Sequence, residues 1–215
     1  MESPKFPQWP IQSFVERLAE ASPLPGGGCA VALAGALAAA LGSLAAQLSR
    51  KKTQDRRANQ QDRNLLDKIR EQQSAFLEFL DADALAYHNV VQAQRRPSLT
   101  PEQRLDRRQA LDTAYLQACA PALQMASQGI ELLQEAALLV EQDNPVTRAD
   151  VGVMVFLAEA VVQGALINIF SNLSMIRDST RAGTAQQQAE RIKEQLPGLI
   201  DPLKSALLGR VLDRP

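Results

Sequence analysis

A run of twenty residues without a charged side chain, from Cys29 to Leu48, limits most strongly what this chain can fold into. The run is mostly alanine and glycine, which favours a closely packed helix over a strand. One stripe of leucines recurs at spacings of three and four and predicts a helix over about 29–50. The leucines are Leu33, Leu37, Leu41, Leu44 and Leu48. A stripe of small residues, Gly35, Ala39, Gly42 and Ala46, lies nearly opposite, so we expect a buried central helix.

The same run is long enough to cross a membrane, but its composition argues against that interpretation. Alanine and glycine dominate where a membrane span would carry leucine, isoleucine and phenylalanine. The preceding segment contains Glu16, Arg17 and Glu20 instead of the basic start of a signal peptide. We therefore expect no contact with a membrane.

Length and composition indicate the number of domains, the fold class and the cellular compartment. The 215 residues suit a single domain spanning 1–215, and 46% apolar residues with only 4% aromatic ones favour packed helices. A net charge of -1 provides no field that would attract nucleic acid. Two cysteines, Cys29 and Cys119, are too few for a disulfide framework, so we expect a reducing compartment and a cytoplasmic protein.

The rest of the chain predicts an all-α helical bundle, since no segment alternates apolar and polar residues as a strand would. Thr100 is expected to cap a helix that has Pro101 at its first position and a kink or break at Pro121. Thr147 and Asp150 resemble a capping box. The expected helices cover 11–21, 29–50, 65–94, 101–142, 147–177, 184–195 and 200–212.

Asp83 is the first candidate for chemistry, because it falls on the apolar face of the helix expected over 65–94. A carboxylate buried there without compensation has a raised pKa, which suits proton transfer near neutral pH. The alternative is a structural ion pair with an arginine of the helix over 101–142. Asp81 points about 200° away and is expected to be solvated.

Two asparagines, Asn168 and Asn172, lie one turn apart on an apolar stripe of the helix over 147–177. Such amides either bind a planar heterocycle or join two helices by hydrogen bonds. Asp150 shares the stripe but lies roughly 27 Å from Asn168 along a straight helix. Either a second subunit unites the two ends, or Asp150 only caps its helix.

Three glycines, Gly26, Gly27 and Gly28, precede the alanine-rich helix and leave backbone N–H groups free for a ligand, although such stretches are more often turns. Cys29 follows them as either a thiol of lowered pKa or a small buried side chain. His88 points away from Asp83, which argues against a catalytic triad or a histidine metal site.

Taken in order, these features resemble the formiminotransferase-cyclodeaminase C-terminal family. The resemblance covers about 11–180, with several ordered motifs of which none is decisive alone. They are Leu24-Pro25-Gly26-Gly27-Gly28 with the small-residue helix, Lys51-Lys52, Asp81-Ala82-Asp83-Ala84 with Tyr87, Thr100-Pro101-Glu102, Arg107-Arg108, Pro121, Asn144 six residues before Asp150, and Gly164-Ala165 before Asn168 and Asn172.

The resemblance implies a homodimeric helical enzyme that acts on 5-formimidoyl- or 5,10-methenyltetrahydrofolate. It implies Asp83 as the acid/base and no permanently bound cofactor or metal. Substrate binding is implied for the pterin at Asn168 and Asn172, for the polar edge at Gly26, Gly27, Gly28 and Cys29, for the glutamate tail at Lys52 or Arg108, and for Asn144 and Asp150 as further family positions.

Two departures keep alternatives open: Cys29 and Ala149 stand where the family usually has serine. Loss of these hydroxyls is compatible with a catalytically silent folate-binding relative. A helical scaffold whose small-residue face docks a partner helix is the other alternative. The formiminotransferase portion of bifunctional relatives does not occur in these 215 residues, so the expected substrate is a free folate. The sequence does not distinguish a formimidoyl from a methenyl group as the one-carbon substituent of that folate.

Overall fold

A computed structural model describes residues 5–49 and 56–212, and all regular structure within those ranges is helical. A short 3-10 helix, η1, covers Phe6–Gln8. The α-helices are α1 (Ile11–Ala19), α2 (Gly27–Ser49), α3 (Arg56–Gln94), α4 (Pro101–Gln142), α5 (Arg148–Ser174) and α6 (Ser179–Leu212). The prediction of an all-α bundle is confirmed.

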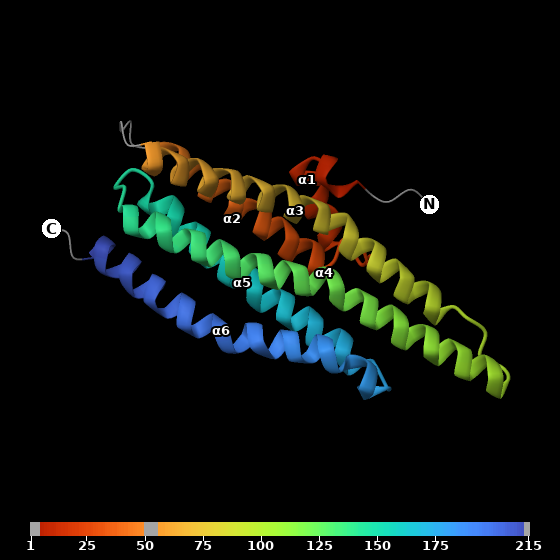
Figure 1. Ribbon diagram of the computed structural model, residues 1–215. Helices are drawn as coiled ribbons and strands as arrows, with labels where there is room; N and C mark the ends of the chain where they lie inside the picture. Colours follow the sequence, from red (N-terminus) through yellow and green to blue (C-terminus); the bar gives the residue numbers. More distant parts are fainter. Residues whose placement is uncertain (1–4, 50–55, 213–215) are drawn as a thin grey trace.

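Helices α2 to α5 form a four-helix bundle in which α2 packs against α3 and α5, and α4 packs against α3 and α5. Helix α6 lies along both α4 and α5. Figure 1 shows α3, α4 and α6 as one layer with α2 and α5 behind them. Successive long helices run in opposite directions, so the start of α2 and the end of α5 lie at the same end of this pair.

Helix α2 is buried through its small residues, as predicted. A Cβ atom on Gly35 would lie 2.3 Å from the Phe76 ring of α3, and one on Gly42 would lie 2.8 Å from Met154 of α5. The leucine stripe differs from the prediction of a helix buried on all sides, because Leu37, Leu44 and Leu48 are 42–54% exposed. The small residues are required where the neighbouring helices approach closely, whereas these three leucines face away from the bundle and Leu33 and Leu41 are partly buried against the core.

The N-terminal segment is held against α3 by a hydrogen bond that was not expected. The backbone N–H of Phe6 donates to Asp81 Oδ1 at 2.9 Å, so the prediction of a merely solvated Asp81 is wrong. Phe6 and Phe14 are buried and pack edge to face. Asp81 therefore has a structural role two residues before Asp83, on the other side of α3.

Helix boundaries agree with one capping prediction and contradict another. Thr100 and Gln103 form a capping box before Pro101, and α4 continues without a break through Pro121. Thr147 does not cap α5 with its side chain, so the capping box expected with Asp150 is wrong. Its buried hydroxyl instead lies 3.5 Å from both Ser49 Oγ and the Asn144 carbonyl oxygen.

The two helices expected over 184–195 and 200–212 are a single helix, α6, which contains Pro197 and Pro202. Each proline removes one helical hydrogen bond, which favours a break in an isolated segment. Packing against α4 and α5 compensates by burying one apolar stripe of α6. That stripe is Leu196, Ile200, Leu203 and Leu207.

Candidate active site

A cavity of about 270 Å³ opens where the start of α2, the second half of α3 and the end of α5 meet, with α4 closing one side. Helices that are neighbours in the bundle but distant in sequence supply its walls. It is lined by Pro23, Leu24, Gly26, Gly27, Gly28, Asp83, Ala86, Tyr87, Val90, Gln94, Tyr115, Ala118, Asn168 and Asn172. Six of the predicted site residues therefore share one cavity: the three glycines, Asp83 and the two asparagines.

The first turn of α2 lies directly against the Asp83 carboxylate. A Cβ atom on Gly28 would lie 2.0 Å from Asp83 Oδ1, so only glycine permits this approach. A Cβ atom on Gly27 would instead have Asn168 Oδ1 as its neighbour, at 4.0 Å. The glycines thus bring the start of a helix, with its free N–H groups, between the acidic and amide side chains.

Asp83 has no ion-pair partner among residues 5–49 and 56–212, which contradicts the alternative of a structural pair with an arginine of α4. Its side-chain hydrogen-bond partner is the Cys29 thiol, with Sγ 3.5 Å from Oδ2. Burial raises the pKa of Asp83, and hydrogen bonds from the thiol and main chain of Cys29 partly oppose that rise. A carboxyl group in this setting can take up and release a proton.

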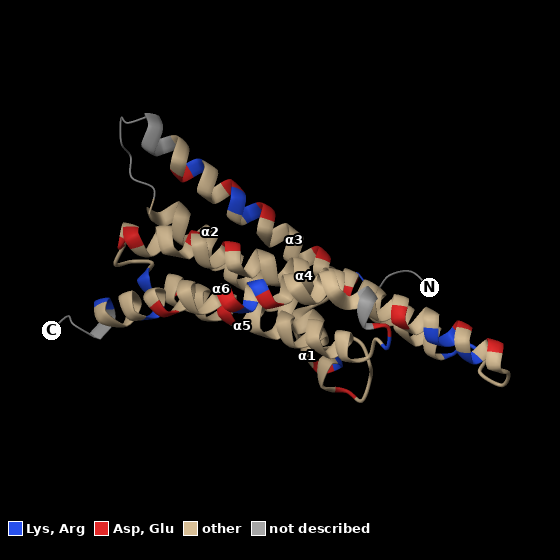
Figure 2. Ribbon diagram, turned by 60° about the horizontal axis from the view of Figure 1, so that its bottom comes forward, with Lys and Arg blue, Asp and Glu red and all other residues tan. Residues whose placement is uncertain are grey.

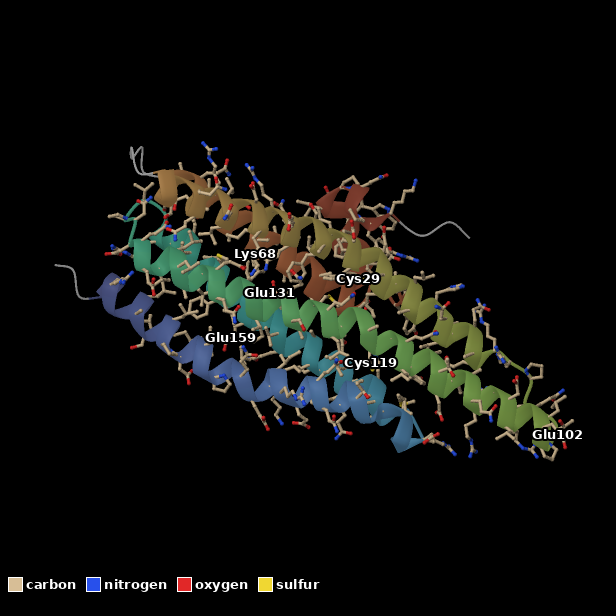
Figure 3. The ribbon with its side chains drawn as sticks, in the orientation of Figure 1. Cys29, Lys68, Glu102, Cys119, Glu131 and Glu159 are labelled. Atoms are coloured by element: carbon tan, nitrogen blue, oxygen red, sulfur yellow. The ribbon has the colours of Figure 1, made fainter. Side chains whose placement is uncertain are left out.

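Cys29 is fully buried behind Asp83 and does not line the cavity. Its Sγ also lies 3.4 Å from the Leu80 carbonyl oxygen (Figure 3 labels Cys29). Burial, with the nearby charge of Asp83 adding to it, raises the pKa of Cys29 to about 12. The thiol is therefore a neutral donor to Asp83, and the alternative of a reactive thiolate is wrong.

Asn168 and Asn172 are half-buried, and their side chains line the cavity wall formed by α5. Within the described ranges neither amide forms a side-chain hydrogen bond, so the alternative in which they join helices is not what the structure has. Amides at a cavity wall without partners can bind a ligand that offers both donors and acceptors.

Arg108 lines a second cavity of about 510 Å³ that shares Gln94 and Tyr115 with the first. Three more arginines border it: Arg104, Arg107 and Arg177. Because the two cavities meet at the same two residues, an elongated ligand can extend from Asp83 towards this basic end. Guanidinium groups bind carboxylates well, so the basic cavity suits an acidic tail.

Asn144 and Asp150 lie at the opposite end of α5 from the cavity. The Asn144 side-chain amide donates to the Leu48 carbonyl oxygen at 3.3 Å and to Ser49 Oγ at 3.1 Å, so it joins the end of α2 to the start of α5. Asp150 belongs to the first turn of α5. The structure therefore does not bring either residue to the cavity of the same chain, and Lys52 lies outside the described residues.

Gln94 and Tyr115 also line the cavity, although neither was predicted as a site residue. Gln94 Nε2 donates to Tyr115 Oη at 3.3 Å across the junction of the two cavities. The available signal was that Tyr115 is one of only two tyrosines in the chain and sits near Ala114 and Ala118. Among the described residues no group of three or more histidine, cysteine and acidic side chains could hold a metal ion.

Known proteins resemble this chain over most of its length. It is 29% identical over 190 residues to the formimidoyltransferase-cyclodeaminase of Gallus gallus, covering 86% of this chain and about a third, 34%, of that relative. It is 28% identical to the methenyltetrahydrofolate cyclohydrolase of Methylorubrum extorquens, covering 88% of both chains.

The fold also has a solved counterpart. The crystal structure of formiminotetrahydrofolate cyclodeaminase from Thermotoga maritima superposes with a TM-score of 0.83 at 24% identity, covering 95% of this chain and 98% of that one. The family model described as formiminotransferase-cyclodeaminase matches residues 10–191. This chain therefore belongs to the formiminotransferase-cyclodeaminase family.

Proposed function

We propose that the chain is a cytoplasmic enzyme of folate one-carbon metabolism, formed by one domain, active as a homodimer and without a resident cofactor. Its substrate is 5,10-methenyltetrahydrofolate or 5-formimidoyltetrahydrofolate. One observation carries the proposal: the Asp83 carboxylate is partly buried at a cavity wall and has no cation beside it among the described residues.

A buried carboxylate without a partner is costly, so a ligand that supplies positive charge gains by binding next to it. The N5–CH–N10 bridge of methenyltetrahydrofolate is an amidinium cation. It is the substrate of the cyclohydrolase reaction and the product of the cyclodeaminase reaction. Asp83 therefore offers stabilisation to the charged species that both reactions share.

In cyclohydrolysis, water adds to the bridge carbon, one C–N bond breaks and 10-formyltetrahydrofolate and a proton are released. Asp83 accepts the proton of the attacking water and transfers it to N5 as that nitrogen leaves. The neutral Cys29 thiol, 3.5 Å from Oδ2, orients the carboxylate during these transfers.

In cyclodeamination, N10 attacks the formimidoyl carbon, and the bond from that carbon to the imino nitrogen breaks. The formimidoyl group reacts in its protonated form, N5–CH=NH2⁺, whose nitrogen already carries two hydrogens. Asp83 takes the proton from N10 and donates it to that nitrogen, which leaves as ammonia while the positive charge stays on the bridge. The resulting methenyl cation then faces the ionised Asp83. Both reactions thus use the same residue as a proton carrier and counter-charge.

Binding would be divided between the two adjoining cavities. Asn168 and Asn172 address the donors and acceptors of the pterin, and backbone N–H groups of Gly26, Gly27 and Gly28 bind its polar edge. Arg108 binds the glutamate tail in the basic cavity, with Lys52 as the other candidate. A folate spanning both cavities matches the few-hundred-Å³ size usual for small-molecule sites.

The test is turnover of both substrates by purified protein. Methenyltetrahydrofolate absorbance should fall faster than in buffer if the chain is a cyclohydrolase. Ammonia release from 5-formimidoyltetrahydrofolate, with gain of the methenyl absorbance, identifies a cyclodeaminase. Each assay is run beside Asp83→Asn, which should lose the enzymatic rate.

Two results would favour the alternatives. Thermal stabilisation by folates without turnover of either substrate identifies a silent folate-binding relative. In that case Cys29→Ser, which restores the hydroxyl usual in the family, tests whether the thiol is responsible. Absence of any folate binding leaves the helical scaffold.

A further inference from the structure

The cavity that holds Asp83 and the basic cavity meet at a junction formed by two side chains. Gln94 and Tyr115 line both cavities. Gln94 is the last residue of α3, and Tyr115 lies in the first half of α4. A ligand that occupies both cavities must therefore pass these two side chains, so the junction can select what the ligand carries at its middle.

Tyr115 is held in place by two kinds of contact. Its side chain packs against a small apolar cluster between α3 and α4. The cluster consists of Val90, Ala93, Ala114 and Ala118. The hydroxyl oxygen of Tyr115 accepts a hydrogen bond from Gln94 Nε2 at 3.3 Å. The rest of the side chain is exposed at the junction, so an already ordered aromatic ring faces a ligand and loses little freedom on binding.

The two sides of the junction differ in chemistry. On one side lie the Asp83 carboxylate and the amides of Asn168 and Asn172. On the other side lie the four arginines of the basic cavity. Figure 2 shows Lys and Arg along the part of α4 nearest the turn that follows α3. A ligand that crosses the junction therefore needs donors and acceptors at one end and negative charge at the other.

The spacing along α4 fixes the separation of the ring from the positive charges. Residues of one face follow each other at intervals of four, three and four. They are Tyr115, Leu111, Arg108 and Arg104. Seven residues at 1.5 Å each place Arg108 roughly 10 Å from Tyr115 along the helix axis. The apolar Leu111 lies between them, so the middle of the ligand passes uncharged side chains before its acidic end reaches a guanidinium group.

A tetrahydrofolate carries its chemical groups in this same order. Its p-aminobenzoyl ring joins the pterin to the glutamate, and N10 is the amino nitrogen of that ring. With the pterin at Asn168 and Asn172 and the glutamate at Arg108, the ring falls at Tyr115. The glutamate α-carboxylate is four bonds from the ring, which span about 5 Å, and the Arg108 side chain covers the remaining distance. Aromatic rings in contact attract each other in offset-stacked or edge-to-face arrangements.

We infer that Tyr115 binds the p-aminobenzoyl ring of the folate, and that Gln94 is a positioning residue that acts through the Tyr115 hydroxyl. Tyr87, the other tyrosine of the chain, is 40% exposed and lines the cavity of Asp83, but it does not border the basic cavity. Tyr87 therefore lies at the pterin end, and Tyr115 at the junction. The inference rests on the proposed function for the identity of the ligand.

The first experiment separates the ring from the hydroxyl by steady-state kinetics. Tyr115→Leu keeps an apolar side chain on the cluster but removes the ring, so KM should rise about 3–10-fold while kcat stays near the wild-type value. Tyr115→Phe keeps the ring and loses only the hydrogen bond, so its KM should rise less, as should that of Gln94→Leu. If Tyr115→Phe raised KM as much as Tyr115→Leu, the hydroxyl and not the ring would bind the substrate, which contradicts the inference.

The second experiment divides the ligand into its two halves and needs no turnover. Calorimetry measures the binding of p-aminobenzoyl-L-glutamate and of 6-methyltetrahydropterin to the purified protein. Tyr115→Leu should weaken binding of p-aminobenzoyl-L-glutamate about 3–10-fold and leave that of the pterin unchanged. Tyr87→Leu is the matched control, because it removes the tyrosine at the other end of the first cavity. It should leave binding of p-aminobenzoyl-L-glutamate unchanged.

The outcomes distinguish the inference from the proposed function. Turnover of either folate, with KM and fragment binding unchanged in Tyr115→Leu, overturns the role of Tyr115 and leaves the proposed function standing. A wild-type protein that turns over folate but does not bind p-aminobenzoyl-L-glutamate at millimolar concentration also overturns that role. Fragment binding of the expected pattern without turnover of either folate overturns the proposed function and supports the assignment of the junction.

Discussion

Two carboxylates on neighbouring helices, the partly buried Asp83 of α3 and the buried Glu135 of α4, have different surroundings. Glu135 is 3% exposed, and its Oε1 lies 2.7 Å from Lys68 Nζ, which also reaches Glu131 at 3.5 Å (Figure 3). Asp83 has the Cys29 thiol and a glycine beside it instead of a cation. Burial raises the pKa of both acids, but only Glu135 has a lysine that opposes the rise.

This difference shows that burial alone does not identify a reacting acid. Both carboxylates border a cavity, since Glu135 also lines a groove between α3 and α4. Lys68 forms a salt bridge with Glu135. The hydrogen bond in that pair is the main cause of the raised pKa of Lys68. Asp83 remains available to a ligand, so the partner, more than the burial, separates a structural carboxylate from a functional one.

The comparison is tested most severely by removing each negative charge. Asp83→Asn should lower turnover by about 10²–10⁴-fold while the protein stays folded, because a neutral amide carries no proton between water and substrate. Glu135→Gln makes the same kind of change and should leave turnover near the wild-type value. Steady-state rates and circular dichroism of both variants check this. Equal losses of turnover in the two variants would show that Asp83 and Glu135 do not differ in function.

The next largest effect is expected from displacing the Asp83 carboxylate without removing it. Gly28→Ala places a methyl group 2.0 Å from the present position of Oδ1, so the carboxylate must move. We expect a loss of about 10–100-fold in kcat, because a displacement of this order spoils the reacting geometry. Gly198→Ala, where nothing lies within 4 Å, is the control. An unchanged kcat in Gly28→Ala would show that the position of the carboxylate is unimportant.

Lys68→Met reverses the comparison by leaving Glu135 buried without a cation. The free energy of unfolding should fall by about 1–3 kcal/mol, less than for a fully buried pair because Lys68 is half exposed. Turnover per folded molecule should stay the same. Urea unfolding measures the loss, which should shrink at acid pH as Glu135 becomes protonated. A loss independent of pH would assign it to packing.

The smallest effect is on the pH dependence of stability. The folded chain binds the Asp83 proton more tightly than the unfolded chain, because burial raises the pKa above its usual 3.8. The free energy of unfolding should therefore fall as pH rises from about 3.8 through the raised value, and stay level above it. Asp83→Asn should reduce the slope of the free energy of unfolding against pH. The slope that remains is due to Glu135, whose pKa is also raised. Identical slopes in urea titrations would mean that Asp83 is not desolvated.

Much of the fold could be predicted because helical periodicity is local. The stripe containing Asn168 and Asn172 and the apolar face containing Asp83 followed from spacing alone. The break expected before 200 was wrong because burial of Leu196 and Ile200 against other helices outweighs two prolines. The capping box at Thr147 was wrong because the hydroxyl is used near Ser49, almost one hundred residues away.

The sequence by itself determined which residues form helices and which polar groups lie on their apolar faces, since both depend on neighbours within about one turn. Only the tertiary structure decided that Asp83 meets Gly28 and Cys29 instead of an arginine, and that Leu37, Leu44 and Leu48 of α2 face outward. These contacts join residues more than fifty positions apart. Their distances depend on how whole helices pack, which no local pattern specifies.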